Sequence, residues 1–395
     1  MTPAARVQMA IEVLDQVIGA ARTRGAAADV ILARWFAERR FAGSKDRRAI
    51  RALVYDAIRL CGEVPVSGRA ALLAVARTRP ELAALFDGSH YGPAVHVEGE
   101  PEAVPGIAPA WLETAFEASG LEAAERAALL GRAPLDLRVN RLKTTPEALA
   151  ATFDGAERLA FAPDALRLRE DTPVDRSPAY LDGAFEVQDA GSQLVSALAG
   201  AAPGETVIDL CAGGGGKTLA LAAAMDNRGT ILACDVDRPR LSRLLPRAER
   251  AGVHIAETLL LDPGREAERL AAWQDRADLV LVDAPCSGTG TWRRNPEARW
   301  RLTPAQLDRY VDTQAHLLDL AARLVRPGGR LVHIVCSLLD AEGAGQVERF
   351  LAAQPGWAAV PFDAPAGRRR GEGLRLTPLH DGTDGFFVAK LVRQC

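Results

Sequence analysis

The spacing of apolar residues divides the chain into a helical N-terminal part and an alternating C-terminal part. Within residues 1–86, apolar positions recur at helical spacing, as at Val7 and Ile11. From Glu205 onward, short apolar runs alternate with helical segments such as 304–324. This alternation predicts a parallel sheet that is covered by helices on both faces.

The C-terminal part contains seven strand candidates. The first five are "TVIDLC", "TILACDV", "ETLLL", "ADLVLVDA" and "RLVHIVCS". The last two, "GLRLTP" and "GFFVAKLV", are separated by the turn-rich "LHDGTD" and are expected to pair as a hairpin. We therefore expect an α/β fold with a mostly parallel seven-stranded sheet that ends in an antiparallel hairpin.

Changes in this pattern predict the domain boundaries. The stretch "DGSHYGPAVHVEGEPEAVPGIAP" is rich in Gly and Pro and lacks periodicity, which is typical of a linker. We expect an all-helical domain over 1–86, a linker with short helices over 87–134, a small α+β region over 135–200 and an α/β domain over 201–395.

Composition narrows the class of protein without identifying it. The 395 residues suffice for two or three domains, and 48% hydrophobic with 25% charged residues describes a soluble globular chain. A formal net charge of −3 argues against a wholly basic nucleic-acid coat. We find no uncharged apolar run of membrane-spanning length, and Glu12 and Asp15 stand where a signal peptide would be apolar. The expected compartment is the cytoplasm.

Positive charge is concentrated near the start of the chain. Residues 1–60 hold eleven Lys and Arg against six Asp and Glu, a local charge of 11 − 6 = +5. The excess lies in "RWFAERRFAGSKDRRAIR". Two interpretations stay open: a solvated helix face, or an electrostatic contact surface for RNA.

The segment "VIDLCAGGGGKT" ends like a phosphate-binding loop but fails both standard patterns. A Walker A loop needs a glycine six residues before Lys217, where Cys211 stands. The dinucleotide pattern needs a third glycine where the chain has Thr218. The remaining signal is an acidic strand end, Asp209, followed by glycines that let a ligand approach the backbone.

Carboxylates at the next strand ends indicate what that ligand is. Asp235 ends the second strand, where it can accept hydrogen bonds from ribose hydroxyls. Asp262 follows the third strand and can accept from an adenine amino group. These acids suit a nucleoside cofactor without pyrophosphate, and we predict S-adenosylmethionine. The alternative is that the acids cap helices.

Two thiols follow the fourth and fifth strands. Cys286, three residues after Asp283, and Cys336 are expected at the carboxyl edge of the sheet, where such folds bind ligands. Either cysteine alone would be an ordinary small buried residue. The chain has no CxxC pair, so no zinc site is expected, and free thiols suit a reducing compartment.

A thiol beside a methyl donor has a chemical use. A thiolate that adds to C6 of cytosine turns C5 into a nucleophile, which takes the methyl group, and loss of the C5 proton expels the thiol. The attacking thiol must be deprotonated, and Asp283 would hold the N3/N4 edge of the base. This reasoning does not rank the two thiols. The need to extrude the base favours unpaired RNA as substrate.

Four motifs in order resemble one family. "VIDLCAGGGGKT", "DAPCSGTG", "RRNPEARW" and "VCSL" are similar to the Nop/Sun RNA cytosine-5 methyltransferases over residues 135–395. "DRRAIRALVYDAIR" resembles the NusB-like helical domain of the bacterial Sun/Fmu branch, which methylates small-subunit ribosomal RNA. The resemblance implies a Rossmann-like class I methyltransferase that is preceded by an all-α NusB-like RNA-binding domain. We expect a monomer that uses S-adenosylmethionine and needs neither metal nor membrane.

The resemblance also implies roles for individual residues. It makes Cys336 the nucleophile and assigns Cys286 to product release. The cofactor contacts that it implies are Cys211, Ala212, Gly213, Gly214, Gly215, Gly216, Lys217, Asp235, Arg240, Asp262 and Asp283.

The chain departs from the family at three places. Gly213-Gly214 replaces the usual Ala-Pro of the cofactor loop, which removes the fixed φ of proline. His333-Ile334-Val335 replaces Tyr-Ser-Thr, and strand alternation puts His333 on the face opposite Cys336. We therefore expect a packed imidazole instead of a base. Glu342-Gly343 replaces Glu-Asn.

Three other functions stay open: an RNA-binding or ribosome assembly factor without activity, a methyltransferase of tRNA or another RNA, and a DNA cytosine methyltransferase. The last places its nucleophile in Pro-Cys-Gln, whereas this chain has Pro-Cys-Ser. Two further basic runs are expected to line an RNA path on the catalytic domain, and for the second, "GRRR", solvated surface is the alternative. They comprise Arg293, Arg294, Arg299, Arg301, Arg368, Arg369 and Arg370.

Overall fold

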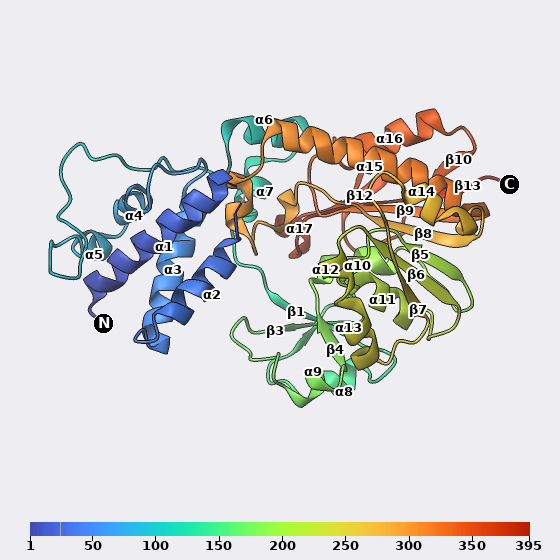
Figure 1. The fold of residues 1–395 in the computed structure, drawn as a ribbon, viewed down its shortest axis with the longest axis horizontal. Helices are drawn as coiled ribbons and strands as arrows, with labels where there is room; N and C mark the ends of the chain where they lie inside the picture. Colours follow the sequence, from blue (N-terminus) through green and yellow to red (C-terminus); the bar gives the residue numbers. More distant parts are fainter. Residues whose placement is uncertain (24) are drawn as a thin grey trace. The chain divides into compact units, whose positions relative to one another are not determined.

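The computed structural model describes residues 1–23 and 25–395, which form two compact units (Figure 1). We call the first the helical unit; it comprises Met1–Gly131 and Thr291–Pro304. The second, the α/β unit, comprises Arg132–Gly290 and Ala305–Cys395. Among the described residues, no helix is long and apolar enough to cross a membrane.

The helical unit confirms the helical pattern of the first 86 residues. Its helices are α1 (Pro3–Thr23), α2 (Ala28–Glu38), α3 (Ser44–Leu60), α4 (Gly68–Ala76), α5 (Pro80–Ala83), α6 (Ala110–Ala118) and α7 (Ala123–Ala128). Leu14 of α1, Trp35 of α2 and Ile58 of α3 are buried in one core. The Gly- and Pro-rich stretch 87–109 connects α5 to α6.

The segment Thr291–Pro304 joins the helical unit, although the sequence placed it in the α/β domain. Trp292 packs edge to face on Phe116, with ring centroids 5.3 Å apart. The buried Arg299 guanidinium donates to the carbonyl oxygens of Ile58 (2.6 Å) and Cys61 (2.9 Å), near the C-terminus of α3. A helix C-terminus leaves carbonyls without intrahelical partners, and this arginine satisfies two of them.

These contacts correct the interpretation of "RRNPEARWR" as the lining of an RNA path. Arg293 and Arg299 are buried, and Arg301 donates to the carbonyl oxygens of Gly25 and Ala26. Arginine carries five donors on a planar group, so it can be buried wherever several carbonyls converge. Arg293, Arg299 and Arg301 therefore do not form an open basic surface, whereas Arg294 is exposed.

The α/β unit contains the predicted sheet, with strand order β11-β12-β13-β9-β8-β5-β6-β7 and with β10 paired to β13. Parallel pairs join the five central strands, and β13 runs antiparallel to both β9 and β12. The seven predicted strands are all present, and short strands β10 and β11 extend the sheet. The bounds are β5 (Thr206–Asp209), β6 (Thr230–Asp235), β7 (Ala256–Leu260), β8 (Ala277–Asp283), β9 (Val325–Val335), β10 (Trp357–Val360), β11 (Arg368–Arg370), β12 (Gly373–Leu376) and β13 (Phe386–Arg393).

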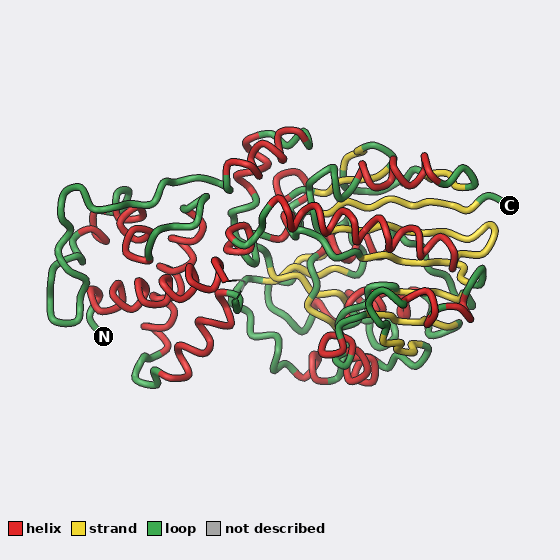
Figure 2. Tube along the Cα trace, turned by 45° about the horizontal axis from the view of Figure 1, so that its top comes forward, coloured by secondary structure: helices red, strands yellow, loops and turns green. Residues whose placement is uncertain are grey.

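Alternate residues of the central strands supply two cores. Leu279 and Leu281 of β8 pack with α10, α11 and α13, whereas Val280 and Val282 pack with α15 and α16. Figures 1 and 2 show these two groups of helices on opposite sides of the sheet. The helices of this unit are α8 (Pro146–Ala150), α9 (Pro178–Leu181), α10 (Ala190–Ala197), α11 (Gly216–Ala224), α12 (Arg238–Leu241), α13 (Leu244–Ala251), α14 (Glu266–Arg269), α15 (Pro304–Leu324), α16 (Ala344–Ala353) and α17 (Pro378–Asp381).

A second, antiparallel sheet precedes the large one and leads into α10. Its order is β2-β3-β1-β4, and Leu137 and Phe185 contribute to its core. The mixed α+β pattern of this region is therefore observed. The strands are β1 (Leu135–Val139), β2 (Glu157–Arg158), β3 (Ala165–Leu168) and β4 (Phe185–Val187).

Candidate active site

The glycine-rich loop between β5 and α11, residues 211–217, has a backbone that requires glycine at two positions. Gly213 has φ of 54° and Gly215 has φ of 84°, both in the left-handed region that side chains disfavour. A Cβ on Gly215 would also lie 2.6 Å from Cγ of Leu244. We call this segment the cofactor loop.

Hydrogen bonds from two backbone amides of the cofactor loop connect this loop to the end of β6. The Ala212 amide donates to the carbonyl oxygen of Cys234 at 2.8 Å. Asp235 accepts from the amides of Gly213 (2.7 Å) and Asp237 (2.8 Å). Each carboxylate oxygen has a second lone pair, so Asp235 still fits the hydroxyl donors of a ribose.

The other residues that the sequence assigned to the cofactor are placed around the same loop. Asp262 follows β7 and is exposed. Arg240 is exposed, and its guanidinium lies beside Gly213, where Nη2 is 2.5 Å from the position of a hypothetical Cβ. Burial is the main cause that raises the pKa of the half-exposed Cys211 well above its ordinary value.

Asp209 at the end of β5 is buried and holds the start of α11. Its Oδ2 accepts from the Thr218 hydroxyl at 2.6 Å, while Oδ1 has no partner. Burial raises the pKa of Asp209 to about 7, and the negative charges of Asp283 and Asp235 add to that effect. This carboxyl group therefore titrates near neutral pH.

Lys217 and Asp283 form an ion pair with Nζ 2.6 Å from Oδ2. Burial alone lowers the pKa of Lys217, but the Asp283 carboxylate outweighs it, and the net pKa is raised. Cys336 also favours the charged ammonium, which shows that this cation and the thiol lie near each other. The pair thus places one positive and one negative group at the strand edge.

Cys286 and Cys336 lie in contact, with their sulfur atoms 3.4 Å apart. The pKa of Cys286 is raised well above its ordinary value, first because its S–H bonds to Cys336, then because of burial and the charge of Glu342. Either sulfur can be the donor across this contact, so a thiolate formed at one cysteine is stabilised by the S–H of the other.

Glu342 joins the two loops that carry the cysteines, which sequence reasoning missed. Its buried carboxylate accepts from the Ser287 amide (2.8 Å), the Ser337 hydroxyl (2.5 Å) and the Gln314 amide (3.1 Å). The Ser287 hydroxyl donates to it as well. A serine directly after each cysteine, in "PCS" and "VCS", was the available signal.

His333 is packed, as its place on the strand indicated. It is fully buried, and Nε2 lies 2.9 Å from the carbonyl oxygen of Glu342. Burial lowers the pKa of His333 to about 4. A neutral imidazole in this position supports the loop and does not act as a base on Cys336.

The run "GRRR" has a mixed environment. Arg370 pairs with the Asp340 carboxylate, and Arg375 of β12 pairs with the same group at 2.5 Å. Arg368 and Arg369 are exposed. Arg370 is therefore held in an ion pair, whereas the exposed Arg368 and Arg369, the latter 3.7 Å from the Glu372 carboxylate, stay accessible for a contact with RNA.

The strand order, the cofactor loop at the carboxyl end of β5 and the acids at neighbouring strand ends define a Rossmann-like methyltransferase domain. S-adenosylmethionine is the cofactor of this class, and the carboxylates fit its nucleoside. A family model described as 16S rRNA methyltransferase RsmB/F matches residues 196–392. The chain belongs to the RsmB/F family.

Individual relatives agree with this placement. A protein named "Probable ribosomal RNA small subunit methyltransferase B" from Synechocystis is 36% identical over 72% of this chain and 66% of its own length. Ribosomal RNA small subunit methyltransferase B from Sodalis glossinidius is 33% identical over 81% of this chain and 75% of its own. The crystal structure of PH0851 superimposes with a TM-score of 0.75 and 26% identity over 99% of both chains.

Proposed function

We propose that this protein transfers the methyl group of S-adenosylmethionine to C5 of a cytosine in small-subunit ribosomal RNA. The observation that carries the chemistry is the contact between the sulfur atoms of Cys286 and Cys336 beside the cofactor loop. The names of the relatives support ribosomal RNA as the substrate.

In the proposed reaction, Cys336 adds as a thiolate to C6 of the cytosine, which forms an S–C6 bond and makes C5 electron-rich. Asp283 holds the N3/N4 edge of the base, and Lys217 pairs with that carboxylate. Bound S-adenosylmethionine supplies an electrophilic methyl group, which C5 takes. Loss of the C5 proton then breaks the S–C6 bond and returns the thiolate.

Cys286 acts in the release of the product. The two sulfur atoms lie within hydrogen-bond distance, so in this proposal the Cys286 S–H stabilises the Cys336 thiolate before attack and again after elimination. We assign the cofactor contacts to the loop 211–217, with Asp235 and Asp262 on the nucleoside and Arg240 beside Gly213.

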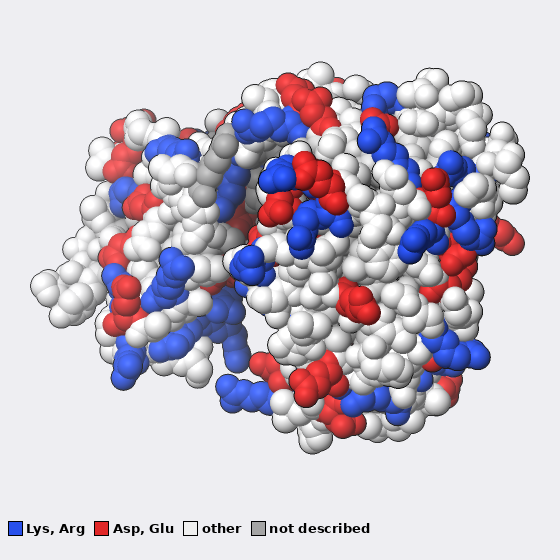
Figure 3. Space-filling model, turned by 45° about the vertical axis from the view of Figure 1, so that its right-hand side comes forward, with Lys and Arg blue, Asp and Glu red and all other residues white. Residues whose placement is uncertain are grey.

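We assign RNA binding to a basic surface of the NusB-like helical unit, between α2 and α3. The side chain of Phe41 is 69% exposed there. The exposed basic residues around it in the sequence are Arg40, Lys45, Arg48 and Arg51. Figure 3 shows basic side chains gathered on the visible face of this unit. An exposed ring among cations is suited to stack on an unpaired base while the cations contact phosphates.

Transfer of a labelled methyl group to ribosomal RNA, tRNA and DNA oligonucleotides tests the proposal. We expect 5-methylcytosine in digests of ribosomal RNA or of small subunits, and none in DNA. Transfer to tRNA alone or to DNA would contradict the assigned substrate. Absence of transfer to all of them, despite cofactor binding, would favour an assembly factor.

A further inference from the structure

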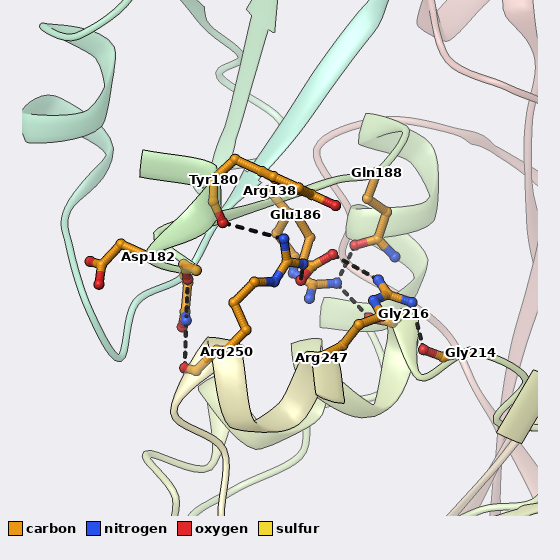
Figure 4. Close-up of polar contacts among 12 residues, drawn as sticks. Arg138, Tyr180, Asp182, Glu186, Gln188, Gly214, Gly216, Arg247 and Arg250 are labelled. Atoms are coloured by element: carbon orange, nitrogen blue, oxygen red, sulfur yellow. Dashed lines mark hydrogen bonds and ion pairs between the residues drawn. The ribbon is translucent and has the colours of Figure 1, made fainter. Parts of the chain in front are cut away.

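Two arginines hold the cofactor loop from outside the family motifs (Figure 4). Arg247 of α13 donates from Nη1 to the carbonyl oxygen of Gly214 at 2.5 Å. Arg138 of β1 donates from Nη1 to the carbonyl oxygen of Gly216 at 2.6 Å. The Gly214 carbonyl belongs to the peptide group that precedes the left-handed Gly215, and the Gly216 carbonyl belongs to the group that joins Gly216 to Lys217, so the backbone is held on both sides of this glycine.

The arginines are themselves oriented by side chains of β4 and the residue after it. Glu186 is buried, and its Oε2 accepts from Nη2 of Arg247 at 2.8 Å. Gln188 accepts from Arg138 through Oε1. Burial lowers the pKa of Arg138 to about 10, so its guanidinium stays charged near neutral pH. Charged hydrogen bonds of this kind are short and directional.

The loop has a particular need for such support. Gly213 to Gly216 are four consecutive glycines, which have more backbone conformations available than a segment that carries side chains or a proline. A flexible loop must lose this freedom when the cofactor binds, which weakens binding. Fixing two of its carbonyls in advance reduces that cost.

We propose that Glu186 is a positioning residue for cofactor binding. It orients Arg247, which fixes the Gly214 carbonyl and so limits the backbone freedom of the four consecutive glycines. The small antiparallel sheet thereby contributes to cofactor affinity through β4. The inference rests on the proposed role of the loop in binding S-adenosylmethionine, and it is independent of the nucleic acid that is methylated.

Arg250 provides a matched control on the same carboxylate. It pairs with Oε1 of Glu186, but its other contacts are the carbonyl oxygen of Tyr180 at 3.2 Å and the Tyr180 ring at 4.1 Å. Arg250→Gln therefore removes one ion pair from Glu186, while the hydrogen bond from Arg247 to Gly214 is retained. A purely structural role of Glu186 would make Arg250 and Arg247 equivalent.

The test is the dissociation constant of S-adenosylmethionine, measured by calorimetry on the full-length protein. We expect Glu186→Gln and Arg247→Gln each to weaken binding roughly tenfold, with Arg250→Gln within about twofold of wild type. The double variant Glu186→Gln/Arg247→Gln should bind S-adenosylmethionine as tightly as Arg247→Gln alone. Both substitutions interrupt the same chain of hydrogen bonds to Gly214, so their effects should not add. Equal losses of affinity for S-adenosylmethionine in Arg250→Gln and Arg247→Gln would overturn the inference. Unchanged affinity in Arg247→Gln would overturn it as well.

Amide hydrogen exchange in the cofactor-free protein tests the positioning role of Glu186 without depending on the proposed function. We expect faster exchange of the amides of residues 213–219 in Arg247→Gln and Glu186→Gln, and wild-type rates in Arg250→Gln. If the wild-type protein failed to bind S-adenosylmethionine, the proposed function would be wrong while the exchange rates still reported on the loop. Unchanged exchange in all variants would contradict the positioning role of Glu186.

Discussion

The sulfur atoms of Cys286 and Cys336 lie 3.4 Å apart at the ends of two neighbouring parallel strands. The register pairs Asp283 of β8 with Ile334 of β9, and Cys286 follows β8 by three residues while Cys336 follows β9 by one. A thiolate formed at either cysteine therefore lies within hydrogen-bond distance of the S–H of the other.

Removing the Cys286 thiol should make Cys336 less acidic. The Cys286 S–H stabilises a thiolate at Cys336, so Cys286→Ala removes that stabilisation and the alkylation profile of Cys336 should move to higher pH. The rate of iodoacetamide labelling of Cys336, followed by mass spectrometry from pH 6 to 10, measures the shift. Cys61→Ala, which removes a buried thiol of the helical unit, is the control, and an unchanged profile in Cys286→Ala would contradict the hydrogen-bond assignment.

Glu342→Gln should reduce methyl transfer by roughly ten- to a hundredfold, since about 1.5–3 kcal/mol is expected for a charged hydrogen bond. An amide offers one acceptor oxygen in place of two, so Ser287 and Ser337 can no longer both be held. Turnover at saturating RNA and cofactor is the measurement. Glu348→Gln, which changes an exposed residue of α16, should leave turnover unchanged. Wild-type turnover in Glu342→Gln would show that the loops do not depend on this carboxylate.

Asp209 should make folding stability depend on pH. Its folded pKa, about 7, lies above the ordinary value, so the folded state retains a proton that the unfolded state releases near pH 4. The retained proton stabilises the folded state fully below about pH 4, and this stabilisation is lost as the pH rises through 7. The free energy of unfolding of the wild-type protein should therefore fall between pH 5 and pH 8. In Asp209→Asn this fall should be smaller by about 2–3 kcal/mol. Urea unfolding at both pH values measures this, and an identical change in the variant would contradict it.

Substitutions of Arg299 and Arg48 should affect different properties: the first should reduce folding stability, and the second should reduce RNA binding. Arg299→Ala should destabilise the protein by about 3 kcal/mol, because it removes several buried hydrogen bonds and leaves the Ile58 carbonyl without this donor, whereas Trp300 still donates to Cys61. The exposed Arg48→Ala should leave stability unchanged but weaken RNA binding and reduce its salt dependence. Thermal unfolding and filter binding at several salt concentrations compare the two variants. A stable Arg299→Ala protein with a reduced salt slope would restore the RNA interpretation of that arginine.

The sequence predicted those features that depend on local pattern. Buried parallel strands are continuous apolar runs, and the turn-rich "LHDGTD" marked the terminal hairpin, so the strands were identified correctly. The same pattern placed the glycine loop, Asp235, Asp283 and both cysteines at one edge, where the structure brings them together.

Features that depend on distant contacts could not be read from the pattern. Arg299 was counted as surface charge, yet it donates to Cys61, 238 positions away in the sequence. Glu342 was visible only as part of a motif, because its role comes from hydrogen bonds to two separate loops. Glu186 and Arg247 lie outside the motifs altogether, and only the fold brings them to the cofactor loop.

The most direct test of the account is covalent trapping on RNA that contains 5-fluorocytosine, in the presence of labelled S-adenosylmethionine. Fluorine at C5 prevents the loss of a proton from that carbon, so the S–C6 bond should persist after methyl transfer. We predict an adduct with wild-type protein and with Cys286→Ala, and no adduct with Cys336→Ala. An adduct that persists in Cys336→Ala and disappears in Cys286→Ala would reverse the roles of the two thiols and contradict the central claim.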